Sequence, residues 1–171
     1  GRVGALAISL KEAENYYKKS AQMWEKQVLI RSRSSAGDAQ VFHNFFASVE
    51  SSVFSNEITV AEALENVKRS KDKINFEKSA KNGFDVKLGK GGIREIEFIA
   101  QVFQLIRGGK ESWLQETGIF KILPLLAATN CLPADVVSEL LTAYEFLRIT
   151  EHRLQEYNDQ QTHSLPTTEL D

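Results

Sequence analysis

Residues 87–109 read KLGKGGIREIEFIAQVFQLIRGG and contain a strongly helical pattern. From Ile93 to Arg107 it is apolar on most sides and contains no helix breaker, until two glycines end the pattern. At about 100° per residue, its polar side chains fall in one stripe roughly 80° wide: Arg94, Glu97, Gln101 and Gln104. A helix that is apolar on nearly every other side usually lies at the centre of its domain. We therefore predict a central helix over residues 93–107.

Upstream of this helix, the sequence predicts three further helices. They cover residues 9 to about 32, the stretch that follows Asp38, and a stretch that opens at residue 59. Two of these starts have the spacing of a capping box, in which a hydroxyl and a carboxylate satisfy free backbone N–H groups: Ser9 with Glu12, and Thr59 with Glu62.

Downstream, we expect a helix over residues 119–128 and a long one from Pro133 to about Asp159, since proline suits the first turn of a helix. Residues 84–88 are expected to be a short extended piece. Residues 2–8 are too short and too rich in small side chains for a helix, and we interpret them as a strand remnant. Together these patterns predict an all-α fold, a helical bundle-like domain with a short N-terminal β remnant.

Composition limits the classes of function. The chain has 171 residues and a net charge of −2, which argue for an ordinary globular domain and against a nucleic-acid binder driven by bulk charge. Its single cysteine, Cys131, cannot form an internal disulfide and fits a reducing compartment. No apolar run approaches the roughly 20 residues of a membrane span, and no signal peptide is visible at the start. We therefore expect a cytoplasmic protein with no membrane or nucleic-acid partner.

The glycine-rich turn before the central helix has two interpretations. It could simply form a tight turn, or its N–H groups and the positive end of the helix dipole could hold an anion such as phosphate. Lys87 and Lys90 flank the turn and favour the anion slightly. The spacing of the glycines matches neither the dinucleotide-binding fingerprint nor the Walker loop.

The polar stripe of the central helix is also open to two interpretations. It could face solvent or enter structural pairs, or it could line a cleft, because charges are costly inside a protein unless they are paired. Glu95 and Glu97 diverge by roughly 160° on a helix, so they cannot grip one metal ion together. The three histidines have no second histidine or cysteine at zinc-ligand spacing, so we expect no metal site.

Glu151 lies within an apolar stripe of the long helix predicted after Pro133. A carboxylate in such a place needs a cationic or hydrogen-bonding partner. Arg148 is three residues back on the same helix and can reach it, and Arg94 is a candidate from another helix. A structural ion pair is the simplest prediction.

Several blocks of the chain, in order, resemble one enzyme family. Residues 87–99, KLGKGGIREIEFI, are similar to a signature of the bifunctional glutamine synthetase adenylyltransferase/adenylyl-removing enzymes. The likeness continues in four further blocks: WEKQVLIRSR at 24–33, QVFQLIRGG at 101–109, EHRLQ at 151–155 and DQQTHSLP at 159–166.

The resemblance implies an activity and partners. One half of such an enzyme attaches AMP to a tyrosine of glutamine synthetase, and the other removes it by phosphorolysis, which yields ADP. The pair Arg94–Glu95 and the run from Phe103 to Arg107 look more like the N-terminal, AMP-removing half. The parent enzyme would use Mg or another divalent metal with ATP, ADP and phosphate. Its partners would be glutamine synthetase, the PII signal protein and glutamine as an effector.

The family's catalytic core uses a Gly-Ser turn and an Asp-x-Asp pair, and this chain contains neither. The resemblance therefore implies that residues 1–37 are the trailing strand and helix of a nucleotidyltransferase core, and that residues 38–171 form the helical domain after it. On this view the chain carries no catalytic residue, needs no cofactor of its own and is inactive alone.

Two functions of different classes follow. In the first, the helical domain completes a nucleotide or phosphate cleft. Lys87 and Arg94 would neutralise phosphate, and Gly91 and Gly92 would offer N–H donors. Glu97 would orient Arg94 or a metal-bound water. In the alternative, the domain is a regulatory or interaction module that binds the PII protein or glutamine synthetase through exposed faces such as residues 57–81.

Overall fold

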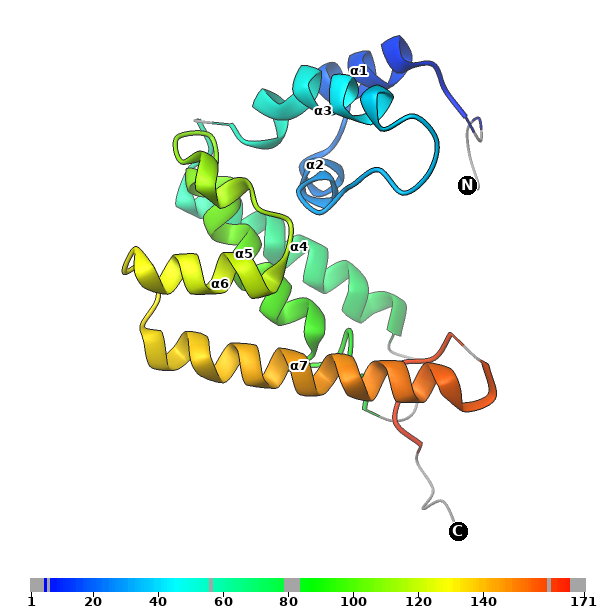
Figure 1. Cartoon of the computed structure of the whole chain (residues 1–171), viewed down its shortest axis with the longest axis vertical. Helices are drawn as coiled ribbons and strands as arrows, with labels where there is room; N and C mark the ends of the chain where they lie inside the picture. Colours follow the sequence, from blue (N-terminus) through cyan, green and yellow to red (C-terminus); the bar gives the residue numbers. More distant parts are fainter. Residues whose placement is uncertain (1–4, 6, 56, 79–83, 160, 167–171) are drawn as a thin grey trace.

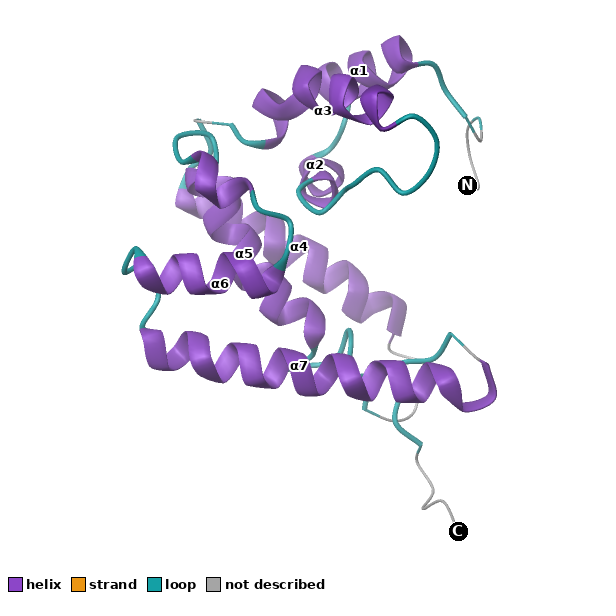
Figure 2. Ribbon diagram, in the orientation of Figure 1, coloured by secondary structure: helices purple, strands orange, loops and turns teal. Residues whose placement is uncertain are grey.

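The computed structural model describes residues 5, 7–55, 57–78, 84–159 and 161–166. Within these ranges the chain is built from α-helices joined by turns and two short 3-10 segments, with one isolated β-bridge (Figure 2). The helices are α1 (Leu10–Lys19), α2 (Met23–Leu29), α3 (Ala39–Val53), α4 (Val60–Lys78), α5 (Ile93–Arg107), α6 (Ile119–Ala128) and α7 (Ala134–Glu156). The predicted all-α fold is confirmed. The predicted strand at residues 2–8 lies mostly outside the described residues.

The single helix predicted from residue 9 to about 32 is wrong, because the chain breaks it into α1 and α2. The break follows from a second capping box: Gln22 is the N-cap of α2, and its backbone N–H donates to Glu25 Oε2 at 2.8 Å. Tyr16 on α1 donates a hydrogen bond to the other carboxylate oxygen of Glu25 at 2.6 Å, and this bond links α1 to α2 across the corner between them. As a result α2 turns away from α1 and packs against α3 and α4.

The predicted helix starts at residues 38 and 59 are confirmed. Asp38 caps α3 by accepting the N–H of Gln40 at 2.8 Å, and Thr59 and Glu62 form the expected capping box of α4. α3 packs against both α1 and α2, as the upper part of Figure 1 shows. α3 follows the domain boundary expected at residues 37 and 38 but packs on the two helices that precede it, and that boundary stays a prediction.

α5 is central, as its apolar surface predicted. It contacts α4 on one side and α6 and α7 on the other, and α6 runs alongside α7 (Figure 1). One apolar core joins α5, α6 and α7, with buried side chains that include Ile93, Ile96, Ala100, Ile122, Leu123, Leu126, Tyr144 and Leu147. A second core lies under α2, α3 and α4 and includes Leu105 of α5. None of the described helices has the length and apolar composition needed to cross a bilayer.

The segment before the glycine turn is tied to the end of the described chain. Asp85 and Ser164 form an antiparallel bridge, Val86 N–H donates to the carbonyl of His163 at 2.9 Å, and Leu165 N–H donates to Phe84 at 2.8 Å. Only the start of the expected extended piece at 84–88 is extended, since turns begin at Val86. This pairing sets the position of the next residue along, Lys87.

Candidate functional site

A cleft of about 540 Å³ opens between α2, α5 and α7. One wall comes from α2 and the residues just after it, the floor comes from the polar stripe of α5, and the far side comes from the turn at 87–88 and from α7. The lining residues include Trp24, Gln27, Val28, Arg31, Lys87, Arg94, Glu97, Phe98, Gln101 and Arg148. Its volume is in the range of small-molecule sites.

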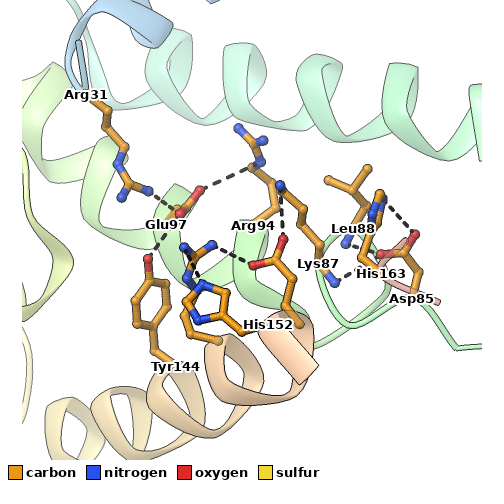
Figure 3. Close-up of polar contacts among 11 residues, drawn as sticks. Arg31, Asp85, Lys87, Leu88, Arg94, Glu97, Tyr144, His152 and His163 are labelled. Atoms are coloured by element: carbon orange, nitrogen blue, oxygen red, sulfur yellow. Dashed lines mark hydrogen bonds and ion pairs between the residues drawn. The ribbon is translucent and has the colours of Figure 1, made fainter. Parts of the chain in front are cut away.

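Glu97 occupies the floor of the cleft and is held from three directions (Figure 3). It forms an ion pair with Arg31 from the end of α2, and Tyr144 of α7 donates a hydrogen bond to it at 3.3 Å. Arg94 Nε lies 3.8 Å from its other oxygen. Only 8% of Glu97 is exposed, so its charge is compensated by protein groups and not by water.

Glu151 forms a second, similar cluster. It is 1% exposed, and its two oxygens pair with Lys87 Nζ at 3.1 Å and with Arg148 Nη1 at 2.6 Å. The predicted partner Arg148 is therefore confirmed, whereas the partner from another segment is Lys87 and not Arg94. Arg148 also lies 3.4 Å from the imidazole of His152.

The two clusters give the cleft an excess of positive charge. Each has one buried glutamate between two cations, and all four cations line the cleft. Four positive charges against two negative ones leave a charge of +2 at the cleft. The cations are 32–37% exposed at the side chain, so they stay accessible to a solute. Such a site attracts a small polyanion.

Arg94 is the cation with unused hydrogen-bonding capacity. Its Nε is buried and has no hydrogen-bond partner within the described chain, and 3.8 Å from Glu97 is too long for one. The guanidinium lies over the ring of Phe98, 6.0 Å from the centroid, which steadies it by a cation–π contact. A ligand oxygen in the cleft would supply the missing acceptor.

Arg31 is a fixed positive charge at this site. Burial acts to lower the pKa of its guanidinium, but the negative charge of Glu97 and hydrogen bonds with Glu97 and Tyr144 outweigh burial. The pKa of Arg31 therefore lies above its ordinary value. Sequence analysis missed Arg31 as a site residue, although it lies in the block at 24–33 that carries the family resemblance.

The glycine turn does not offer the expected donors. Gly91 N–H donates to Glu95 Oε2 at 2.9 Å, and the N–H groups of residues 92–95 donate to backbone carbonyls of residues 86–92. Gly91 has φ +75°, and a Cβ at Gly92 would lie 2.8–3.0 Å from three carbonyl oxygens. The glycines thus serve the tight turn that sets Lys87 beside α5, which favours the first of the two interpretations.

The rest of the polar stripe is a buried hydrogen-bond network. Gln101 accepts a hydrogen bond from Gln27 of α2 at 2.7 Å, and Gln27 in turn accepts one from Asn66 of α4 at 3.0 Å. Further along α5, Gln104 donates to the carbonyls of Leu114 and Glu116. The stripe therefore lines a cleft at its start and enters structural pairs towards its end, so each interpretation holds for part of it.

The described residues include no group of three histidine, cysteine, aspartate or glutamate side chains placed to hold a metal ion. The charged groups that line the cleft are three guanidinium groups, one ammonium group and the carboxylate of Glu97, and the side chains of Tyr144 and Glu151 contact them. These groups can bind and orient an anion.

Comparison with known proteins identifies two family models along the chain. Residues 59–171 match the model described as GlnD PII-uridylyltransferase, and residues 1–48 match the model described as glutamate-ammonia ligase adenylyltransferase. The first of these covers most of the helices that form the cleft, and the second includes α2 with Trp24 and Arg31.

Curated relatives match the chain from end to end. The bifunctional glutamine synthetase adenylyltransferase/adenylyl-removing enzymes of Nitrosococcus oceani, Thioalkalivibrio sulfidiphilus and Pseudomonas putida are 44%, 42% and 40% identical over 98–100% of this chain. The chain spans 17–18% of the length of these relatives. With these matches, the chain belongs to the family of bifunctional glutamine synthetase adenylyltransferase/adenylyl-removing enzymes, and its residues 59–171 belong to the domain family of the PII-uridylyltransferase model.

Proposed function

We propose that this chain is the helical part of the N-terminal half of a cytoplasmic enzyme that removes AMP from glutamine synthetase by phosphorolysis, and that its cleft holds phosphate. The observation that carries the proposal is the pair of buried glutamates, each between two cations, which leaves a charge of +2 in a cleft of about 540 Å³. That charge is complementary to a phosphate dianion.

The role of the cations follows from the reaction. In phosphorolysis an oxygen of inorganic phosphate bonds to the phosphorus of the AMP group, and the bond from that phosphorus to the tyrosine oxygen breaks. The tyrosine oxygen keeps the bonding electrons and takes up a proton, so the products are ADP and the unmodified tyrosine. Two anions must approach each other, so fixed positive charges lower the barrier. Arg94 and Lys87 would contact phosphate oxygens. Glu97 and Glu151 are positioning residues that hold these cations in place.

The chain itself supplies no catalytic carboxylate in this proposal. The divalent metal that the resemblance implies would be held by the parent enzyme's catalytic core, and no step of the reaction is assigned to a metal in this chain. The 171-residue chain alone is therefore expected to remove no AMP from adenylylated glutamine synthetase in the presence of phosphate.

The test uses the parent enzyme, the longer protein in which this chain is the helical part. Arg94→Gln removes a cation from the cleft and leaves Arg31 paired with Glu97, so little else changes. A lost charged hydrogen bond reduces kcat/KM for phosphate by about tenfold or more. The matched control is Arg69→Gln on α4, whose side chain is 78% exposed and whose pair with Glu65 is a surface contact.

The outcomes separate the two classes of function. A loss confined to Arg94→Gln supports the phosphate cleft. Equal turnover in both variants would contradict it and favour the alternative, a regulatory module that binds the PII protein or glutamine synthetase through the exposed face of α4. In that case binding of PII to the parent enzyme would depend on exposed α4 side chains such as Glu65, Lys68 and Arg69.

A further inference from the structure

The α2 wall of the cleft presents an apolar surface beside its cation. Trp24 and Val28 lie at positions i and i+4 on one side of α2, Arg31 lies just beyond the end of α2, and all three line the cleft. Trp24 is 47% exposed and Val28 is 58% exposed. These large apolar side chains lie beside the charged groups that line the same cleft.

The spacing along this wall fits a specific class of ligand. Arg31 lies seven residues after Trp24 and just past the end of α2, so at about 1.5 Å per residue their backbone positions are roughly 10 Å apart. This distance is comparable to the separation of base and phosphate in a nucleotide. Aromatic faces bind bases by stacking, and guanidinium groups bind phosphates, so an indole and a cation at this separation are the two ends of a nucleotide site.

We propose that Trp24 and Val28 form the platform for the base of a nucleoside phosphate whose phosphates lie at Arg31 and Arg94. The inference rests on the proposed function, in which ADP leaves the cleft as the product, and it specifies which part of the cleft holds the nucleoside. Inorganic phosphate alone has no base, so it would use the cationic end only.

The platform is held rigidly by a buried residue between its members. Gln27 is 3% exposed, donates to Gln101 of α5 at 2.7 Å and accepts from Asn66 of α4 at 3.0 Å. These two bonds fix the rotation of α2 about its axis, and therefore the direction in which Trp24 and Val28 face. A platform that is fixed before the ligand arrives loses less entropy on binding.

The test is product inhibition of AMP removal by the parent enzyme. Trp24→Leu keeps an apolar side chain but removes the aromatic face, and we expect the inhibition constant of ADP to rise about tenfold. Trp24→Phe keeps an aromatic face and is expected to rescue most of this loss. Ribose 5-phosphate carries a phosphate without a base, so its inhibition constant and the KM for phosphate are expected to stay within twofold in Trp24→Leu.

The result separates failure of this inference from failure of the proposed function. If ADP inhibits Trp24→Leu as strongly as the unaltered enzyme while Arg94→Gln impairs phosphate use, the platform is wrong and the phosphate cleft stands. If neither variant changes any constant, both proposals fail. If Trp24→Leu weakens ribose 5-phosphate as much as ADP, the indole has a structural role and the platform is likewise wrong.

A second measurement covers the case in which Trp24→Leu does not fold. ADP bound on the platform changes the fluorescence of the indole, so the unaltered parent enzyme should show a saturable change that Trp24→Phe lacks. The same ADP-dependent change in both proteins would overturn the inference.

Discussion

Two buried glutamates determine how the cleft can behave. A buried carboxylate is tolerated only when cations and hydrogen bonds replace its lost hydration. Glu151 is 1% exposed and has two cations at 2.6 and 3.1 Å, whereas Glu97 is 8% exposed and is held by Arg31, Tyr144 and, more distantly, Arg94. Both residues therefore act on ligand binding through the cations that they position.

Replacement of Glu151 by glutamine should destabilise the chain. The substitution keeps the shape of the side chain but leaves Lys87 and Arg148 without a counter-charge. Both cations are about a third exposed and can be rehydrated, so we expect a loss of roughly 2 kcal/mol in the free energy of unfolding. Urea unfolding of the chain measures this. Glu145→Gln, on the exposed side of the same helix, is the control and should change it by less than about 0.5 kcal/mol.

Replacement of Glu97 by glutamine tests positioning against direct participation. We expect a loss of roughly 1–3 kcal/mol in the free energy of unfolding, because Arg31 loses its partner. In the parent enzyme, kcat/KM for phosphate should fall less than in Arg94→Gln. A large loss of activity at unchanged thermal stability would contradict this and would mean that Glu97 contacts the reacting groups.

At the scale of elements, local signals predicted most helices. Capping residues and breakers gave the starts of α3, α4 and α7 and both ends of α5. The corner between α1 and α2 was missed because its N-cap is Gln22, an uncommon capping residue, and because the apolar positions continue across it. The availability of the N–H donors of the glycine turn was misjudged because most of their partners are carbonyls of residues 86–92, whose positions depend on how the turn folds back against the start of α5.

The two last glycines of the turn should respond differently to alanine. Gly92 has φ −80°, which alanine adopts, but a Cβ there would lie within 3.0 Å of three backbone carbonyl oxygens. Gly91 has φ +75° with open space around it, so its substitution costs only about 1 kcal/mol of strain. We expect Gly92→Ala to cost more than about 2 kcal/mol in urea unfolding. A larger loss in Gly91→Ala would contradict this packing of the turn.

The turn should also make stability depend on pH. Burial acts to raise the pKa of Glu95, but its hydrogen bonds with Lys71 and with Gly91 N–H, and the charges of Lys71 and Lys90, outweigh burial and lower that pKa below the ordinary 4.5. A lowered pKa in the folded state gives stability that is present above pH 4.5 and is lost as the pH falls through the folded-state pKa.

The corresponding measurement compares the unaltered chain with Glu95→Gln over a range of pH. The difference in the free energy of unfolding should be largest above the ordinary pKa and should shrink in more acidic solution. A difference that does not change with pH would show that the charge of Glu95 contributes nothing.

At the scale of the whole molecule, the cleft is assembled from segments that are distant in sequence. The sequence predicted three of the residues that line the cleft, Lys87, Arg94 and Glu97, because they lie together in one signature beside glycines that indicate a turn. Arg31 and Arg148 could not be assigned to the same site, because nothing local indicates that α2 and α7 contribute to one cleft beside α5. The sequence did predict the pairing of Arg148 with Glu151, since that pair lies within one helix.

The most direct test of the phosphate cleft observes the Nε–H group of Arg94, which has no hydrogen-bond partner in the described chain. In ¹⁵N-labelled protein, phosphate is titrated against chloride at matched ionic strength, with the exposed Arg69 as the internal control. We predict a saturable shift of the Arg94 resonance with phosphate, and none for Arg69. An Arg94 resonance that does not respond to phosphate, or that moves in parallel with that of Arg69, would contradict the assignment of the cleft.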